Sequence, residues 1–508
     1  MHGIKPAVAS WAARFRAPLI VALTAFIVSY VDPLGVEEAT GDRAAGTVMR
    51  LSSTLWSGSG QVTVVLIDQA YLESQPNPGW PLSYGEQGML LRQIANESPA
   101  AVFVDLLYKN PHRNAPAVLT AARADAADRH DAPADLLEPI RSKDVPFYFA
   151  ALPKYGGVKG QAEEFDVASF SPGLDEQGKL DASLEKRLAL VSWSGYGDYY
   201  PLRLGRAGAV RTPAYALYQD RCIAHRLPCA SESRQFEKPM RVRWGAFVPQ
   251  KIAGHIDAGV CQYTDFAGSV NYPDLWLRMR ALAWQFMLAL ADRANEASDV
   301  NSRLPCMSFA VLPASFLSDA SGARNEALIK ESLQGKFVFV GADIPGIPDR
   351  TASPVHGQVP GVMLHAMAME NLLTGEGRYL RATPEWFSIL FKLAILCAVA
   401  VFAASRPLKQ GGFVSAAFVV IGVCAWLGCA AFSFMHDNTA RGMLFLIGGA
   451  LVTWFAAAET GKVIFLFVLI SALALGMIEL GWEPTNWIVL AVAASFVQQI
   501  SRHLRANS

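Results

Sequence analysis

The sequence lacks the short motifs that mark most nucleotide-binding and hydrolytic enzymes. It has no Walker A loop, no Gly-x-Gly-x-x-Gly fingerprint and no His-Glu-x-x-His zinc motif. A nucleophile elbow is also absent, because the stretch from Ser192 to Gly195 lacks the first glycine of that motif. Net charge is missing too, since 44 basic and 44 acidic residues cancel. Without a basic excess we expect no nucleic-acid partner, and without a binding motif we expect no cofactor and no enzymatic activity.

Apolar residues are abundant and unevenly placed. They make up 52% of the chain, which is high for a soluble protein. One apolar run lies near the N-terminus, and nearly everything after Trp386 is apolar. A membrane-spanning helix needs about 20 such residues. We therefore predict about five C-terminal spans, at residues 386–404, 412–434, 442–458, 463–478 and 486–500.

The first apolar run, residues 18–31, is short for a span and also has the length of a signal-peptide core. No clear cleavage site follows it, so we favour an uncleaved signal-anchor and keep a cleaved signal peptide as the alternative. Lys5, Arg14 and Arg16 precede it without any acidic residue and are expected to stay in the cytoplasm. The turns that carry Arg406, Lys409 and Lys462 fall on the same side when the spans alternate.

These patterns divide the chain into four parts. We predict a cytoplasmic N-terminus with a signal-anchor helix at 1–31, an extracytoplasmic domain at 32–385, a five-helix membrane region at 386–500 and a short basic cytoplasmic tail at 501–508. The expected location is the inner membrane, with a large periplasmic domain. The tail is too short for a cytoplasmic output domain, so any signal is expected to pass to a separate cytoplasmic or membrane partner.

The predicted extracytoplasmic domain alternates between strand and helix patterns. Apolar runs at 62–67, 101–104, 145–152 and 337–340 predict buried strands, and helical spacing of apolar residues predicts helices at 84–95 and 362–373. Such alternation favours an α/β fold with a mostly parallel sheet. The Pro- and Gly-rich stretch 341–361 is predicted to be neither helix nor strand. Further helices are predicted within 112–140 and at 276–294.

Polar side chains follow three of the predicted strands. Asp68 and Asp105 end the first two, and Asp349 lies in the loop after the last, with His365 in the next helix. Ligands bind at the carboxyl ends of strands in open α/β sheets, so these four residues are candidate ligand contacts. The alternatives are ordinary ones: each aspartate could cap a helix or fix a turn, and His365 could be a core histidine.

Four cysteines lie in the polar middle of the chain and suit an oxidising compartment. They allow three pairings, of which we favour Cys222–Cys229 and Cys261–Cys306. A zinc site that uses His225 and His255 with these cysteines is a weaker alternative, because the spacing matches no standard finger. We therefore expect disulfides and no metal.

The pieces named above resemble the type 2 CHASE domain, an extracytoplasmic sensory domain found beside cyclases and histidine kinases. The matching stretches are VVLID, WPLS, AVFVDLLY, GKFVFVGA, a Ser-Pro pair and PGVMLHAMAMENLL, in that order over most of residues 60–380. The chain departs from the family at Leu82, Ser83 and Tyr84, where an arginine is common, and at Ser353, where the family has threonine. It also lacks the usual cyclase, kinase or phosphodiesterase module.

The resemblance implies a sensory receptor whose domain responds to an unknown small molecule or to a state of the cell envelope. It names neither the stimulus nor the partner, and a homodimer is compatible with it. Two other functions remain open from the sequence: a membrane-anchored extracytoplasmic hydrolase that uses the aspartates and His365, and an envelope scaffold or assembly protein without a ligand.

Overall fold

The computed structural model describes most of residues 49–404. Its gaps there are 51–52, 54–55, 57, 77, 109–132, 143, 156–161, 176, 205–209, 231–233, 246–306, 319–322 and 348. Outside this range it describes scattered residues between 20 and 46, and residues 477–478, 481–483 and 486. The chain forms two compact units: unit 1 comprises residues 1–49 and 380–508, and unit 2 comprises residues 50–379.

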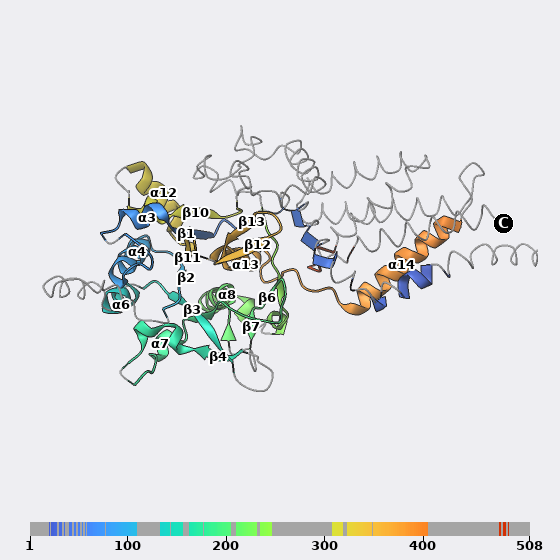
Figure 1. The fold of residues 1–508 in the computed structure, drawn as a ribbon, viewed down its shortest axis with the longest axis horizontal. Helices are drawn as coiled ribbons and strands as arrows, with labels where there is room; N and C mark the ends of the chain where they lie inside the picture. Colours follow the sequence, from blue (N-terminus) through green and yellow to red (C-terminus); the bar gives the residue numbers. More distant parts are fainter. Residues whose placement is uncertain are drawn as a thin grey trace, which may run out of the picture. The chain divides into compact units, whose positions relative to one another are not determined.

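Unit 2 is built on a seven-stranded sheet (Figure 1). The spatial order is β10-β1-β11-β2-β3-β4, and β5 also pairs with β3. All the pairings are parallel except that of β4 with β3. The strands are β1 (Val62–Asp68), β2 (Ala101–Val104), β3 (Phe147–Tyr155), β4 (Ala162–Asp166), β5 (Leu188–Leu190), β10 (Ala310–Pro313) and β11 (Phe337–Asp343). The predicted α/β fold with a mostly parallel sheet is confirmed.

Strand β11 lies in the middle of this sheet although it comes last in the chain. It pairs along its whole length with β1, from Val62 opposite Phe337 to Asp68 opposite Asp343. On its other side Phe337 to Val340 pair with β2. The carboxyl ends of β1, β11 and β2 therefore lie at one edge of the sheet, which places their terminal polar residues near one another.

Alternate residues of the strands pack into two separate cores. Phe103 and Phe339 face a core formed with α8 (Pro213–Ala224) and α13 (Gly361–Thr374), which we call the α13 face. Val102 and Val338 face the opposite core, which we call the α4 face. The helices of the α4 face are α3 (Gln69–Ser74), α4 (Tyr84–Asn96), α6 (Pro133–Ser142), α11 (Ala314–Ser318) and α12 (Ala323–Leu333). Both faces are covered, which explains why the strands are continuous apolar runs.

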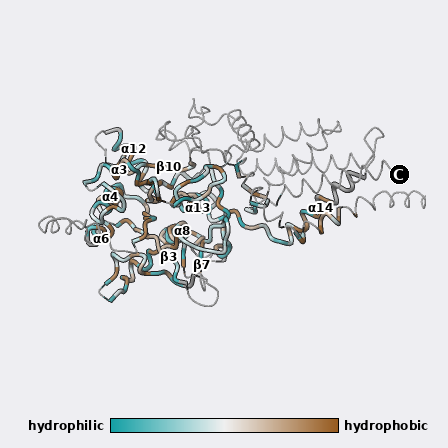
Figure 2. The backbone as a smooth tube through the Cα atoms, in the orientation of Figure 1, coloured by the Kyte–Doolittle hydropathy of each residue, from teal (hydrophilic) through white to brown (hydrophobic). Residues whose placement is uncertain are grey.

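Short elements complete unit 2. Three two-stranded sheets pair β6 with β9, β7 with β8, and β12 with β13. These elements and the short helices are β6 (Tyr199–Tyr200), β7 (Arg203–Leu204), β8 (Val210–Arg211), β9 (Met240–Arg241), β12 (Arg350–Ser353), β13 (Gly357–Pro360), α7 (Ala182–Glu185), η2 (Val167–Ser169), η3 (Ser171–Gly173), η5 (Pro228–Ala230) and η6 (Arg234–Glu237). Hydrophobic and hydrophilic stretches alternate along the elements of the unit (Figure 2).

The hairpin β12–β13 corrects one prediction, because it lies in the stretch expected to be neither helix nor strand. Its prolines are compatible with a hairpin: Pro354 lies just after β12 ends, and Pro360 is the last residue of β13. A proline at either place removes no essential ladder donor. The strand and helix predictions at 62–67, 84–95, 101–104, 145–152, 337–340 and 362–373 are confirmed within a few residues. The predicted helix at 276–294 lies outside the described residues.

Within unit 1 the structure describes helix α14 (Glu385–Ala404), which coincides with the first predicted C-terminal span. The other four predicted spans lie wholly or mostly outside the described residues. Of the first apolar run, residues 22–27 are helical. Among the helices that the structure describes, none is both long enough and apolar enough to cross a membrane.

Candidate functional site

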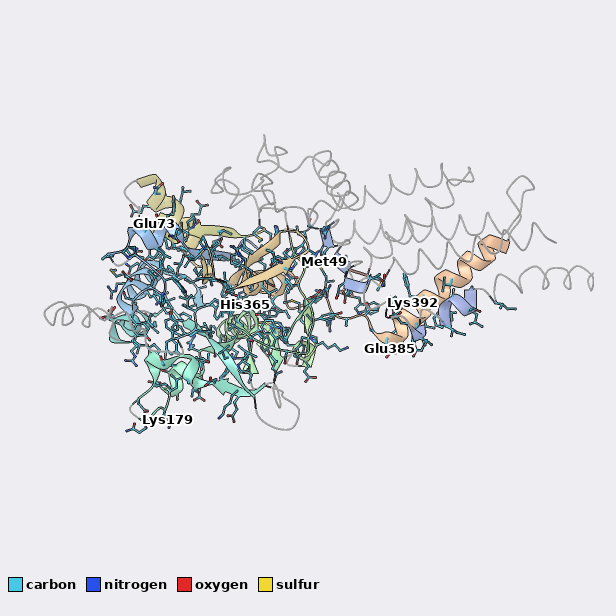
Figure 3. All side chains as sticks on the ribbon, in the orientation of Figure 1. Met49, Glu73, Lys179, His365, Glu385 and Lys392 are labelled. Carbon is cyan, nitrogen blue, oxygen red and sulfur yellow. A yellow bond between two sulfur atoms is a disulfide. The ribbon has the colours of Figure 1, made fainter. Side chains whose placement is uncertain are left out.

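Helix α13 places His365 inside unit 2, under the carboxyl edge of the sheet. The helix starts at Gly361, directly after β13, and His365 lies one turn further on. Its side chain is 5% exposed and lies in the interior of the unit (Figure 3). Three aromatic rings surround the imidazole edge to face, with centroids at 5.6 Å for Phe103, 6.0 Å for Trp193 and 5.6 Å for Tyr200. Burial lowers the pKa of His365 to about 3, so the imidazole is neutral.

A chain of polar contacts runs through this imidazole. The Tyr200 hydroxyl lies 2.9 Å from Nδ1 of His365 and accepts a hydrogen bond from the Ala214 amide at 3.3 Å. A neutral imidazole that accepts a hydrogen bond from the tyrosine hydroxyl at Nδ1 carries its own hydrogen on Nε2. Nε2 faces Oδ2 of Asp105 at 3.8 Å. These polar contacts therefore link the core of the α13 face to the end of β2.

Asp105 comes directly after β2 and is held by the sheet. Its amide donates to the carbonyl of Val340 at 2.8 Å, which continues the ladder between β2 and β11. Its side chain is only 9% exposed. Burial, followed by repulsion from Asp349, raises the pKa of Asp105 to about 8. At neutral pH this carboxyl group therefore holds its proton.

Asp349 lies at the outer end of the cluster. The residue is exposed overall, yet its carboxylate is partly desolvated, and this desolvation raises its pKa. Its carbonyl accepts from the Gly361 amide at 3.1 Å, which fixes the loop to the start of α13. A Cβ at Gly361 would collide with Oδ1 of Asp349. The glycine therefore makes room for the carboxylate.

The structure brings together three of the four candidate ligand contacts and separates the fourth. Asp68 caps helix α3 by accepting from the Tyr71 amide at 3.3 Å. It also accepts from the amide and hydroxyl of Ser315 in α11, at 3.3 and 2.9 Å. These bonds tie Asp68 to helices of the α4 face, which matches the ordinary alternative of a helix cap. Asp105, Asp349 and His365 remain candidate ligand contacts.

Two neighbours of the cluster did not figure among the predicted contacts. Tyr200 and Trp193 come from an irregular segment whose pattern resembles neither helix nor strand, and only its richness in aromatics marks it. Glu370 in α13 was missed as well, and its side chain is fully buried. An acidic residue within the otherwise apolar stretch MAMENLL is a signal that could have identified it, because an ionised group is costly to bury.

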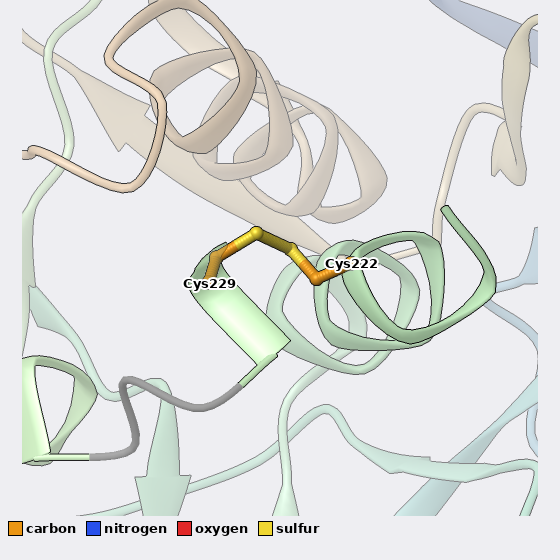
Figure 4. The surroundings of a disulfide bond; sticks show 2 residues. All are labelled: Cys222 and Cys229. Atoms are coloured by element: carbon orange, nitrogen blue, oxygen red, sulfur yellow. A yellow bond between two sulfur atoms is a disulfide. The ribbon is translucent and has the colours of Figure 1, made fainter. Parts of the chain in front are cut away.

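The predicted disulfide Cys222–Cys229 is confirmed, with an S–S distance of 2.03 Å. It joins the last turn of α8 to η5 (Figure 4). Cys261 and Cys306 lie outside the described residues, so their pairing stays a prediction, as does the part of the zinc alternative that uses His255. Among the described residues no group of three or more histidine, cysteine or acidic side chains could hold a metal ion.

Unit 2 is thus an α/β domain with a buried polar cluster at the carboxyl edge of its parallel sheet. The family model for the CHASE2 domain matches residues 19–403, and the chain belongs to this family. CHASE2 domains are extracytoplasmic sensory domains of membrane receptors, so the resemblance inferred from the sequence is confirmed and the chain carries a sensory domain. No curated protein and no solved structure shows significant similarity to it.

Proposed function

We propose that the protein is a multi-pass inner-membrane receptor whose extracytoplasmic domain senses a ligand or an envelope state and signals through a separate partner protein. Membership of the CHASE2 family supports sensing. The apolar runs of the sequence and their flanking cations support several membrane spans.

The observation that carries the ligand-sensing part is the contact chain Tyr200–His365–Asp105, with Asp349 at its outer end. A ligand that reaches Asp349 and Asp105 would act on two secondary elements at once, the loop after β11 and the end of β2. His365 would connect that event to α13. A ligand switches a receptor only through different affinities for two states, and a cluster that joins several elements provides such a difference.

The charges at this edge favour a ligand with a positive charge, such as a primary amine. Asp343 already pairs with Arg350, and Asp68 is bound by Ser315 and the start of α3. Asp105 and Asp349, in contrast, lie beside a neutral imidazole, and Asp105 keeps its proton because burial and the charge of Asp349 disfavour a second carboxylate there. An ammonium group placed between them would favour the ionised form of both carboxyl groups, so Asp105 would release its proton when the ligand binds.

A thermal-stability screen of the full-length protein in lipid nanodiscs tests the ligand site. The probes are ethanolamine and spermidine as amines, succinate as an acid and glucose as a neutral compound. We expect an amine to raise the melting temperature, because a ligand that binds only the folded state stabilises it by mass action. Asp105→Asn and Asp349→Asn should each abolish the shift, and the exposed control Glu73→Gln should keep it. A shift that survives both variants would place the ligand elsewhere.

Topology is a separate test. Lys179 lies at an exposed edge of unit 2 (Figure 3). A phosphatase that is active only outside the cytoplasm, inserted after Lys179, should be active. An inactive enzyme in a stably expressed fusion would overturn the proposed location of the domain.

A hydrolase is the second candidate, because the contact chain from Tyr200 to Asp105 resembles an arrangement for proton transfer. The low pKa of His365 makes it a poor base at neutral pH, and we favour the receptor for that reason. Purified full-length protein should therefore hydrolyse none of a panel of ester, phosphate and glycoside substrates. Turnover that disappears in Asp105→Asn together with Asp349→Asn would establish the enzyme instead.

A further inference from the structure

The last turns of α13 carry two polar side chains that are buried and bind main-chain atoms of distant segments. The Asn371 amide is fully used: Oδ1 accepts from the Arg243 amide at 3.0 Å, and Nδ2 donates to the Arg243 carbonyl at 2.9 Å. Glu370, the residue before it, is 0% exposed. A carboxylate in such a place needs hydrogen bonds or a counter-charge, so its partners are informative.

Within the part of the chain that the structure describes, hydrogen bonds reach only one of the two carboxylate oxygens of Glu370. Oε2 accepts from the Ser59 amide at 2.5 Å. Oε1 is buried and has no hydrogen-bond partner among the described residues. The segment is pressed closely against the carboxylate, since a Cβ on Gly58 would lie 3.1 Å from Oε2 and 2.5 Å from the Ser308 carbonyl. Residues 58–60 thus lie against Glu370 without space for a side chain at Gly58.

One charged neighbour partly compensates for the burial. Lys336, just before β11, donates from Nζ to the Gly60 carbonyl at 2.5 Å, so the same segment is held at two points. Burial raises the pKa of Glu370 to about 7, although hydrogen bonds from Ser59 and Val62 and the charge of Lys336 oppose the shift. These groups come from the segment 58–60, the start of β1 and the start of β11. Lys336 is the charged group among them.

The contact between Glu370 and Ser59 connects segments that lie near the two sequence ends of unit 2. Unit 2 begins at Arg50 and ends at Tyr379. The segment 58–60 leads from the start of the unit into β1, and α13 ends at Thr374, shortly before the unit ends. The contact between Glu370 and Ser59 therefore joins the chain that enters the sensory domain to the helix that leaves it.

We propose that Glu370 and residues 58–60 form a proton-controlled clasp between these two ends of the sensory domain, closed while Glu370 is neutral and loosened when Glu370 is ionised. The contacts of the clasp involve none of the residues of the Asp105 cluster, which are Tyr200, His365, Asp105 and Asp349. The clasp therefore does not depend on a ligand bound at that cluster. It would make the receptor responsive to the pH of the extracytoplasmic space. Because α13 also carries His365, the two sites share one helix.

The raised pKa of Glu370 determines the direction in which pH changes the opening of the clasp. Glu370 binds its proton more tightly in the closed protein than in an opened one, where its pKa returns to the ordinary value of 4.5. The stabilisation is complete below that value and is lost as the pH rises through about 7. The opening equilibrium should increase by up to about tenfold per pH unit within this window and level off above it.

Hydrogen exchange of the full-length protein in nanodiscs tests the clasp. Protection of the peptide that covers residues 58–66, corrected for the intrinsic exchange rate, should fall by up to about tenfold per pH unit between about pH 5 and 7. Glu370→Gln should show the same protection throughout. Glu376→Gln removes an exposed carboxylate six residues further on and should behave like the wild type.

Three outcomes decide the proposal. A wild-type protein whose protection is constant between pH 5 and 7 overturns it without any variant. A slope that persists unchanged in Glu370→Gln overturns it as well. If Glu370→Gln does not fold, Glu370→Met provides a second neutral side chain of similar length. Loss of the slope in either variant, with the slope retained in Glu376→Gln, supports the clasp even if no ligand is found for the Asp105 cluster.

Discussion

The two faces of the central sheet are built from the same strands yet treat buried polar groups differently. On the α4 face the buried Gln87 amide has a structural role: it donates to the Leu82 carbonyl and accepts from the Tyr108 hydroxyl, both at 2.7 Å. Glu86 completes a capping box with Ser83 at the start of α4. On the α13 face, His365 and Glu370 are titratable, and burial shifts the pKa of each.

This difference suggests that the α4 face has a structural role and that the α13 face responds to ligand or pH. Hydrogen-bonded amides and hydroxyls such as those of Gln87, Tyr108 and Ser83 keep their charge state over a wide pH range, so their bonds hold the fold together throughout it. Groups with strongly shifted pKa values cost stability and are concentrated at functional sites. The α13 face carries the Asp105 cluster and the Glu370 clasp, so both proposed functions lie on the same side of the sheet.

The largest expected effect tests whether the two faces contribute equally to stability. Leu90 in α4 is 1% exposed and Leu372 in α13 is 0% exposed. Leu90→Ala and Leu372→Ala should each lower the free energy of unfolding by about 2–5 kcal/mol, because each leaves a cavity in a packed core. Urea unfolding of the full-length protein in detergent, followed by tryptophan fluorescence, measures both. A much smaller loss at Leu372 would mean that the α13 face is already loosely packed.

The second effect is confined to the α13 face. Asp105 holds its proton more tightly in the folded protein, so its contribution is complete below about pH 4 and disappears as the pH rises through about 8. Asp105→Asn should flatten the pH dependence of stability between pH 5 and 8, by up to about 1.4 kcal/mol per pH unit. Melting curves across this range measure it. The exposed control Glu138→Gln should keep the wild-type slope, and an equally steep slope in Asp105→Asn would contradict the assignment.

The smallest effect belongs to the α4 face. Ser83→Ala removes the hydroxyl that accepts from the Glu86 amide at 3.2 Å and should cost about 0.5–2 kcal/mol. The loss should be similar at pH 5.5 and pH 7, because the hydroxyl does not titrate. Thermal unfolding at the two pH values checks it. A loss that grows with pH would show that the α4 face also responds to protons and would remove the contrast between the faces.

The fold was largely predictable because each central strand is a continuous apolar run that ends at a polar residue. Phe337 to Val340 and Ala101 to Val104 are read correctly for this reason. The order of the strands was not predictable, since the pairing of β11 between β1 and β2 depends on contacts between distant segments. The hairpin β12–β13 was missed because prolines at its turn and its end look like strand breakers.

The site was predictable where strand ends supply the polar group. Asp105, Asp349 and His365 meet because β2, β11 and α13 end or begin at one edge of the sheet. The partners of Asp68 were not predictable, because Ser315 is distant in sequence. Tyr200 reaches His365 from a two-residue strand that leaves no periodic signal.

The central place of β11 has a consequence for biogenesis. Until residues 337–343 have been synthesised, β1 and β2 lack the strand that lies between them, and their facing edges have no partner. Pairing over such a long sequence separation is slow, and unpaired strand edges invite aggregation. The sheet of the sensory domain can therefore close only after almost all of the domain has been synthesised, which leaves the facing edges of β1 and β2 unpaired for a long interval.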